Sequence, residues 1–104
     1  MTFSRLDLLK EMLEKEPNDS FLNYAFALEL EKEKKISEAI SIIEKIILLD
    51  KNYLGAYYKL GKLFENVSQN EKAKQTYLLG IEIAQLQKNN KTLNELNGAL
   101  QLLE

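Results

Sequence analysis

The 104-residue sequence contains neither cysteine nor histidine. Without cysteine there is no disulfide framework, and without either residue the commonest general base, thiol nucleophiles and most zinc sites are excluded. Carboxylates remain, but neither a glycine-rich phosphate loop nor a calcium-loop pattern accompanies them. We therefore predict that the protein is not an enzyme and that it has no catalytic residues, no metal site and no cofactor.

The only arginine is Arg5, and the net charge of the chain is −2. Because recognition of phosphates and base edges relies largely on arginine, we do not expect a nucleic-acid partner. No apolar run approaches the ~18 residues of a membrane span, so we expect no membrane association. The first segment, MTFSRLDLLKEMLEK, lacks the uncharged apolar core of a signal peptide. We therefore expect a cytoplasmic protein, and expect this chain to be all or nearly all of it.

Proline and glycine are also scarce, which favours helices over a turn-rich β fold. Apolar residues recur at steps of three and four, the period of an amphipathic helix. This pattern predicts helices at residues 5–16, 20–34, 38–49, 53–67 and 71–88, and a last helix from Thr92. The side chains predicted to cap these helices are Ser4, Asn18 or Asp19, Ser37, Asn52, Ser68 and Thr92. The short connections predict that consecutive helices lie antiparallel.

One pattern of small and large residues occurs twice, 34 residues apart. Its first copy is Asn23-x-x-Phe26-Ala27-x-x-Leu30 followed by Ala39-x-x-x-Ile43. Its second copy is Tyr57-x-x-Leu60-Gly61-x-x-Phe64 followed by Ala73-x-x-x-Tyr77. The small residues allow two helices to approach closely, and the large residues fill the space around them. A repeat of this period indicates stacked helical hairpins, which are usually surfaces for binding another chain.

The pattern resembles the tetratricopeptide repeat family, whose unit is a helix–turn–helix of 34 residues. The resemblance implies an all-α fold, a right-handed α-α superhelix of antiparallel helical hairpins, with residues 1–104 forming a single domain. Its expected parts are an N-terminal helix at 4–16, repeats at 17–50 and 51–86, and a C-terminal capping helix at 91–104. The departures from the family pattern are Asn23 in place of an aromatic residue, Ile46 in place of a small residue, and Lys51 and Gln85 in place of a closing proline.

In this family the first helix of each hairpin lines the concave face, which implies a partner-binding groove. The groove residues would be Phe21, Tyr24, Leu28, Glu31, Tyr58, Lys62, Glu65 and Asn66. Some members of the family hold a terminal carboxylate with lysine and asparagine side chains on these helices. The matching positions here are Tyr24, Leu28 and Lys59, so we do not expect the C-terminal tail of a chaperone as ligand. An alternative role for Phe21, Tyr24 and Leu28 is to pack under the N-terminal helix.

The leading hypothesis is a non-catalytic protein–protein interaction module, or scaffold, that binds a peptide or a partner subunit through the concave face. The alternative is a self-associating structural protein, a homodimer through the terminal helices or the groove, without a separate ligand. Leu100, Leu102 and Leu103 suggest this alternative, because a single neighbouring helix covers only one face of the last helix.

Overall fold

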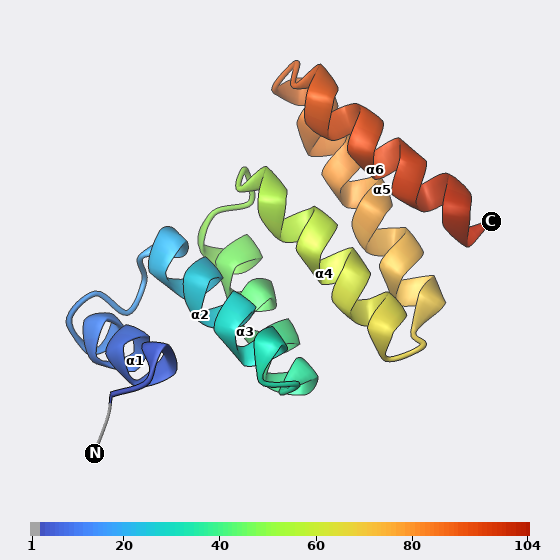
Figure 1. The fold of residues 1–104 in the computed structure, drawn as a ribbon. Coiled ribbons are helices and arrows are strands. Elements are labelled where there is room, and N and C mark those ends of the chain that lie inside the picture. Colours follow the sequence, from blue (N-terminus) through green and yellow to red (C-terminus); the bar gives the residue numbers. More distant parts are fainter. Residues whose placement is uncertain (1–2) are drawn as a thin grey trace.

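The computed structural model describes residues 3–104, which form a row of antiparallel α-helices joined by short turns (Figure 1). The helices are α1 (Arg5–Lys15), α2 (Ser20–Lys32), α3 (Ile36–Leu49), α4 (Leu54–Asn66), α5 (Asn70–Leu86) and α6 (Asn90–Leu103). The predicted all-α fold of stacked helical hairpins is confirmed. In this part of the chain, no helix has both the length and the apolar character that crossing a bilayer requires.

Each helix packs against the one before it, and α4 also contacts α6. The molecule is elongated, with extents of 46 × 28 × 20 Å. In Figure 1, α2, α4 and α6 are nearer the viewer than α3 and α5. The central helix α4 contributes more buried residues than any other helix. The stacking of the two hairpins therefore depends mainly on α4.

The two helices of each hairpin cross where a small residue meets a large one. In the second hairpin, a Cβ atom at Gly61 would lie 2.1 Å from Cε1 of Tyr77, so only glycine fits beneath that ring. The equivalent positions 34 residues earlier hold Ala27 and Ile43, both of which are buried. The first hairpin thus combines an alanine with an isoleucine at these positions, and the second combines a glycine with a tyrosine.

The two hairpins also place a large and a small residue on opposite helices at a second pair of positions, which explains the departures Asn23 and Ile46 from the family pattern. In the second hairpin, a Cβ atom at Gly80 would lie 2.7 Å from Cβ of Tyr57, so a large residue on α4 is matched by a glycine on α5. The equivalent residues of the first hairpin are Asn23 and Ile46, which are 1% and 0% exposed. There the smaller residue lies on the first helix and the larger on the second, so the volume is redistributed between the two positions.

Asn23 and Tyr57, which hold the same position in the two repeats, each donate a side-chain hydrogen bond to a carbonyl in the preceding turn. The side-chain amide of Asn23 donates to the carbonyl of Pro17 at 3.0 Å. The hydroxyl of Tyr57 donates to the carbonyl of Lys51, the equivalent residue, at 2.6 Å. Lys45 also donates to the Pro17 carbonyl, at 2.8 Å. The bonds from Asn23 and Tyr57 tie the turn before each hairpin to its first helix, and the bond from Lys45 ties the first of these turns to α3 as well.

Tight turns of one kind follow α2, α4 and α5. Each contains one non-glycine residue with positive φ, namely Lys34 (63°), Ser68 (61°) and Lys88 (56°). The next N–H donates to the carbonyl five residues earlier, as in the bonds from Lys35 to Leu30, Gln69 to Phe64 and Asn89 to Ala84. This arrangement satisfies carbonyl groups at the ends of the helices. It also makes the following helix begin two residues after the positive-φ residue.

Two of the predicted helix caps are confirmed and the others are wrong. Ser4 forms a capping box with Asp7, and the carboxylate of Asp19 accepts a hydrogen bond from the N–H of Leu22. The wrong predictions are Ser37, Asn52, Ser68 and Thr92, since the residues at these cap positions are Lys35, Tyr53, Gln69 and Asn89. For α3, α5 and α6 the reason is the preceding tight turn, which decides where the helix begins.

The buried tyrosines of the second hairpin keep neutral hydroxyl groups. Burial raises the pKa of Tyr77 above its ordinary value of 10.0, and so does Glu65, whose carboxylate accepts a hydrogen bond from the Tyr77 hydroxyl. Burial also raises the pKa of Tyr57, with a further contribution from Asp50. Removing the proton of Tyr77 would place a negative charge beside the carboxylate of Glu65, and removing that of Tyr57 would break its hydrogen bond to the carbonyl of Lys51.

We predict that Gly61→Ala lowers the free energy of unfolding by about 2 kcal/mol, because the added methyl group overlaps the ring of Tyr77. The gain in helix propensity, about 1 kcal/mol, is too small to offset this overlap. Combining Gly61→Ala with Tyr77→Ile reproduces the pair of the first hairpin and should recover part of the loss. Urea unfolding of both single variants and the double variant measures the coupling. If the changes in unfolding free energy of the two single variants simply add in the double variant, positions 61 and 77 do not compensate for each other's size and the prediction is wrong.

We also predict that the protein loses stability as the pH rises above about 10. The pKa of Tyr77 is higher in the folded state, so the unfolded chain releases a proton that the folded state retains. The resulting stability is fully present below the unfolded pKa and declines as the pH rises beyond it. Tyr77→Phe keeps the ring and should make this decline less steep. Urea midpoints from about pH 8 to about pH 11 test the prediction, and equal slopes for the two proteins would refute it.

Candidate binding surface on α2 and α4

The predicted groove residues lie on one side of α2 and one side of α4. Those on α2, such as Tyr24 and Leu28, are four residues apart and share a face of the helix. Phe26 and Leu30 lie about 200° away around the same helix and pack in the core. The same relation holds between Tyr58 and the buried Leu60 and Phe64 on α4. Phe21 and Leu28 therefore lie on the exposed side of α2, whereas Tyr24 and Tyr58 lie at the edge of the core and are partly buried against it.

The stripe on α2 is apolar and accessible to solvent. Phe21 is 70% exposed and Leu28 is 38% exposed. Helix α1 packs against α2, where the side chain of Arg5 pairs with Glu29 at 3.0 Å. This contact leaves Phe21 and Leu28 exposed, so packing under the N-terminal helix does not account for these two residues.

Tyr24 is half-buried because the turn between α3 and α4 packs against it. Its ring centroid lies 5.6 Å from that of Tyr53 in this turn. A Cβ atom at Gly55 would lie 3.8 Å from the Tyr24 hydroxyl, which is an ordinary contact distance. Burial raises the pKa of Tyr24 above 10.0, and Tyr53 and Glu31 add to the shift. Tyr24 therefore presents a neutral hydroxyl that can donate a hydrogen bond.

An ion pair joins the α2 and α4 parts of this surface. Nζ of Lys59 lies 2.8 Å from Oε1 of Glu31, and both side chains are partly exposed. A pair of this kind contributes about 1 kcal/mol or less to stability. It nevertheless engages both charged groups with each other, which reduces their availability to a ligand.

The α4 part of the surface is a cluster built around tyrosines. Nζ of Lys62 lies 5.5 Å from the ring centroid of Tyr58 and 3.8 Å from Oε2 of Glu65. The ring centroid of Tyr58 is 6.3 Å from that of Tyr77, and the Tyr77 hydroxyl donates to Glu65. Asn66 is exposed at the last position of α4. The charged groove residues of α4 are thus anchored by neighbouring aromatic side chains.

Three neighbours of the groove residues could not be identified as such from spacing. Tyr53 lies in a turn, outside any helical period. Lys59, which pairs with the groove residue Glu31, is 28 residues away from it in the chain. Tyr77 was predicted to face α4 from within the hairpin, but its hydroxyl also reaches Glu65 on the other side. The glycine at position 61 was the one available signal, because it leaves room for the ring to pass.

Comparison with known proteins gives matches among solved structures. Neither a family model nor a curated protein matches the sequence. A solution structure of a tetratricopeptide repeat domain protein from Salinibacter ruber matches with 39% identity and a TM-score of 0.81, covering 85% of this chain and 89% of that one. A protein from Bordetella parapertussis matches with 20% identity and a TM-score of 0.85, covering 98% of this chain and 89% of that one.

A further match is the first tetratricopeptide repeat domain of Spaghetti, solved with a bound HSP90 peptide. It has 24% identity and a TM-score of 0.75, and the match covers 94% of this chain and 76% of that one. The Bordetella and Spaghetti structures show the same fold, and the Salinibacter protein adds sequence similarity over most of both chains. Together with the doubled 34-residue pattern and the hairpins it forms, this similarity shows that the chain belongs to the tetratricopeptide repeat family.

Proposed function

We propose that the chain is a non-catalytic interaction module that binds a peptide or a partner subunit through the groove residues of α2 and α4. The observation that carries this proposal is the exposed apolar stripe of α2, where Phe21 is 70% exposed and Leu28 is 38% exposed beside Tyr24. Phe21 and Leu28 lie on the exposed side of α2, and the half-buried Tyr24 lies between them in the sequence. Exposed apolar residues gathered on one face are typical of binding surfaces.

The chemistry of this surface favours a ligand with apolar side chains. Phe21 and Leu28 offer apolar contact area, while Tyr24 and Tyr58 combine a ring with a hydroxyl that can bond to a peptide carbonyl. Half-burial holds both tyrosines in place, which reduces the entropy lost on binding. In this proposal the repeats at 17–50 and 51–86 supply the surface, and the helices at 4–16 and 91–104 flank them.

The proposed ligand differs from the acidic peptide bound by the Spaghetti domain, SRMEEVD. The positions that hold a terminal carboxylate in some members of the family are occupied here by Tyr24, Leu28 and Lys59. The first two carry no positive charge, and Lys59 is paired with Glu31 at 2.8 Å. These features support an apolar segment as ligand in preference to an acidic chain end.

Self-association through the terminal helices is a second candidate function. Leu100 and Leu103 on α6 are partly buried against the core, whereas Leu102 is 85% exposed. One exposed leucine is common on protein surfaces, so this observation gives weaker support than the stripe on α2.

The proposed function predicts that peptides selected from a random displayed library against the wild-type protein bind to the α2 stripe. Phe21→Ser combined with Leu28→Ser should weaken their binding about tenfold or more, because each side chain supplies exposed apolar contact area. Leu86→Ser is the control, since Leu86 is an exposed leucine at the end of α5. Isothermal titration measures the affinities, and thermal unfolding should be similar for all proteins. Equal binding by the double variant would refute the proposal.

A further inference from the structure

The charged side chains at the α2 and α4 surface are paired with one another. Nζ of Lys59 lies 2.8 Å from Oε1 of Glu31, and Nζ of Lys62 lies 3.8 Å from Oε2 of Glu65. The first pair joins α2 to α4, and the second lies within α4. Two positive and two negative charges balance, so these residues together offer a ligand no net charge.

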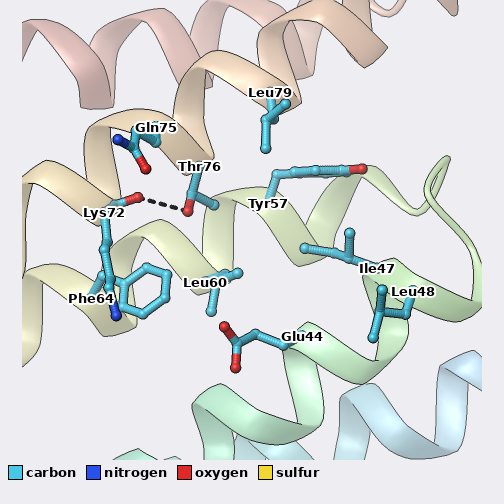
Figure 2. Close-up of a pocket in the computed structure, with 10 residues that line it drawn as sticks. All are labelled: Glu44, Ile47, Leu48, Tyr57, Leu60, Phe64, Lys72, Gln75, Thr76 and Leu79. Atoms are coloured by element: carbon cyan, nitrogen blue, oxygen red, sulfur yellow. Dashed lines mark hydrogen bonds between the residues drawn. The ribbon is translucent and has the colours of Figure 1, made fainter.

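Opposite charges elsewhere on the molecule are not always paired. A hollow of about 580 Å³, which we call the larger hollow, lies on a different side of α4, with Tyr57, Leu60 and Phe64 as its floor. Glu44 from α3 and Lys72 from α5 line it, but within residues 3–104 they form no ion pair (Figure 2). A smaller hollow of about 260 Å³, between α1 and α3, is also lined by lysine and glutamate side chains that are unpaired in the described part of the chain. The pair that joins α2 to α4 is thus a feature of the groove.

Glu31 is not required by the core of its own hairpin. Its equivalent in the second repeat, Glu65, accepts a hydrogen bond from the hydroxyl of Tyr77. The first repeat has Ile43 at the place of Tyr77, and an isoleucine side chain has no donor for a carboxylate. The carboxylate of Glu31 instead accepts a hydrogen bond from Lys59, on the first helix of the next repeat. Its charge therefore contributes to the surface between the repeats.

Lys59 depends on this carboxylate for its counter-charge. The side chain of Lys59 is 23% exposed and that of Glu31 is 33% exposed. A partly buried ammonium group has lost part of its hydration and needs a negative charge nearby. Burial, Tyr53 and Glu31, in this order, raise the pKa of Tyr24. The carboxylate of Glu31 therefore lies close to both Tyr24 and Lys59, where the carboxylate of a ligand could otherwise bind.

A ligand that brought a second carboxylate to Lys59 would meet the charge of Glu31. Two carboxylates beside one ammonium group repel each other, and moving Glu31 away would separate it from its partner. A ligand segment that is uncharged at this point avoids both costs. The pair therefore discriminates between ligands mainly by what it repels.

We propose that Glu31 determines the specificity of the groove, by excluding ligands that carry a carboxylate where they pass over Lys59. The ligand is then an uncharged apolar stretch of a partner chain, and acidic chain ends are rejected. Phe21 and Leu28 supply the attraction for this stretch, whereas Glu31 supplies the exclusion. Because it concerns the same surface, this role of Glu31 rests on the proposed peptide-binding function.

The first test compares glutamate with glutamine, which have nearly the same shape, at each position of a peptide selected against the wild-type protein. At the position over Lys59, the glutamate peptide should bind wild type about threefold or more weakly than the glutamine peptide. In Glu31→Gln this preference should reverse, because Lys59 then lacks a counter-charge. Glu29→Gln is the matched control, since Glu29 also lies on α2, pairs with Arg5 and changes the net charge equally. It should keep the wild-type preference, and isothermal titration measures all the affinities.

Equal ratios of glutamate to glutamine affinity in wild type and Glu31→Gln, at every position, would overturn the role of Glu31 alone. Peptide binding that does not depend on Phe21 and Leu28 would overturn the proposed function as well, so the two failures are distinguishable.

The second test removes both charges of the pair. Glu31→Gln combined with Lys59→Gln should bind the glutamate peptide no better than the glutamine peptide, because the preference of Glu31→Gln comes from Lys59. Thermal unfolding confirms that each variant is folded. A preference for glutamate that persists in the double variant would overturn the proposal, because another group would then attract the carboxylate.

Discussion

The close crossing of the two helices in each hairpin is the contact on which the rest of the structure depends. Gly61 lies under the ring of Tyr77, and Ala27 and Ile43 hold the equivalent buried positions, so in each hairpin a small residue on one helix leaves room for a large residue on the other. Close packing at these crossings directs one side of α4 into the core and leaves other sides free. The exposed side chains of Phe21 and Leu28 take no part in these crossings, so they are free to form the proposed binding surface.

The central helix α4 separates two surfaces of different chemistry. One side carries Tyr58 and Lys62 and joins the apolar stripe of α2, while the other forms the floor of the larger hollow. The two repeats share the same arrangement of helices but differ on both sides. Phe21 and Leu28 are exposed in the first repeat, and Leu48 and Leu79 are exposed beside the second. A duplicated unit has thus acquired a different apolar surface in each region, with its core retained.

The helices and the repeat were predictable from sequence because both rest on local periodicity. The turns were less so: the positive-φ residues are Lys34, Ser68 and Lys88, and no glycine marks these turns. Four cap predictions were wrong, three of them because these turns decide where the next helix begins. The groove residues were assigned to helix faces by spacing, but the spacing did not reveal that Tyr53 packs on Tyr24.

By itself, the sequence determined the class of fold, the phase of the repeat and the chemical groups that are missing. These follow from the order of residue types along the chain. Only the tertiary structure decided which apolar residues remain exposed, since exposure depends on neighbours that are distant in sequence. It showed that α1 leaves Phe21 uncovered and that the two departures Asn23 and Ile46 exchange sizes relative to Tyr57 and Gly80. It also showed the larger hollow, because the packing of three helices creates it and no periodic pattern records such a space.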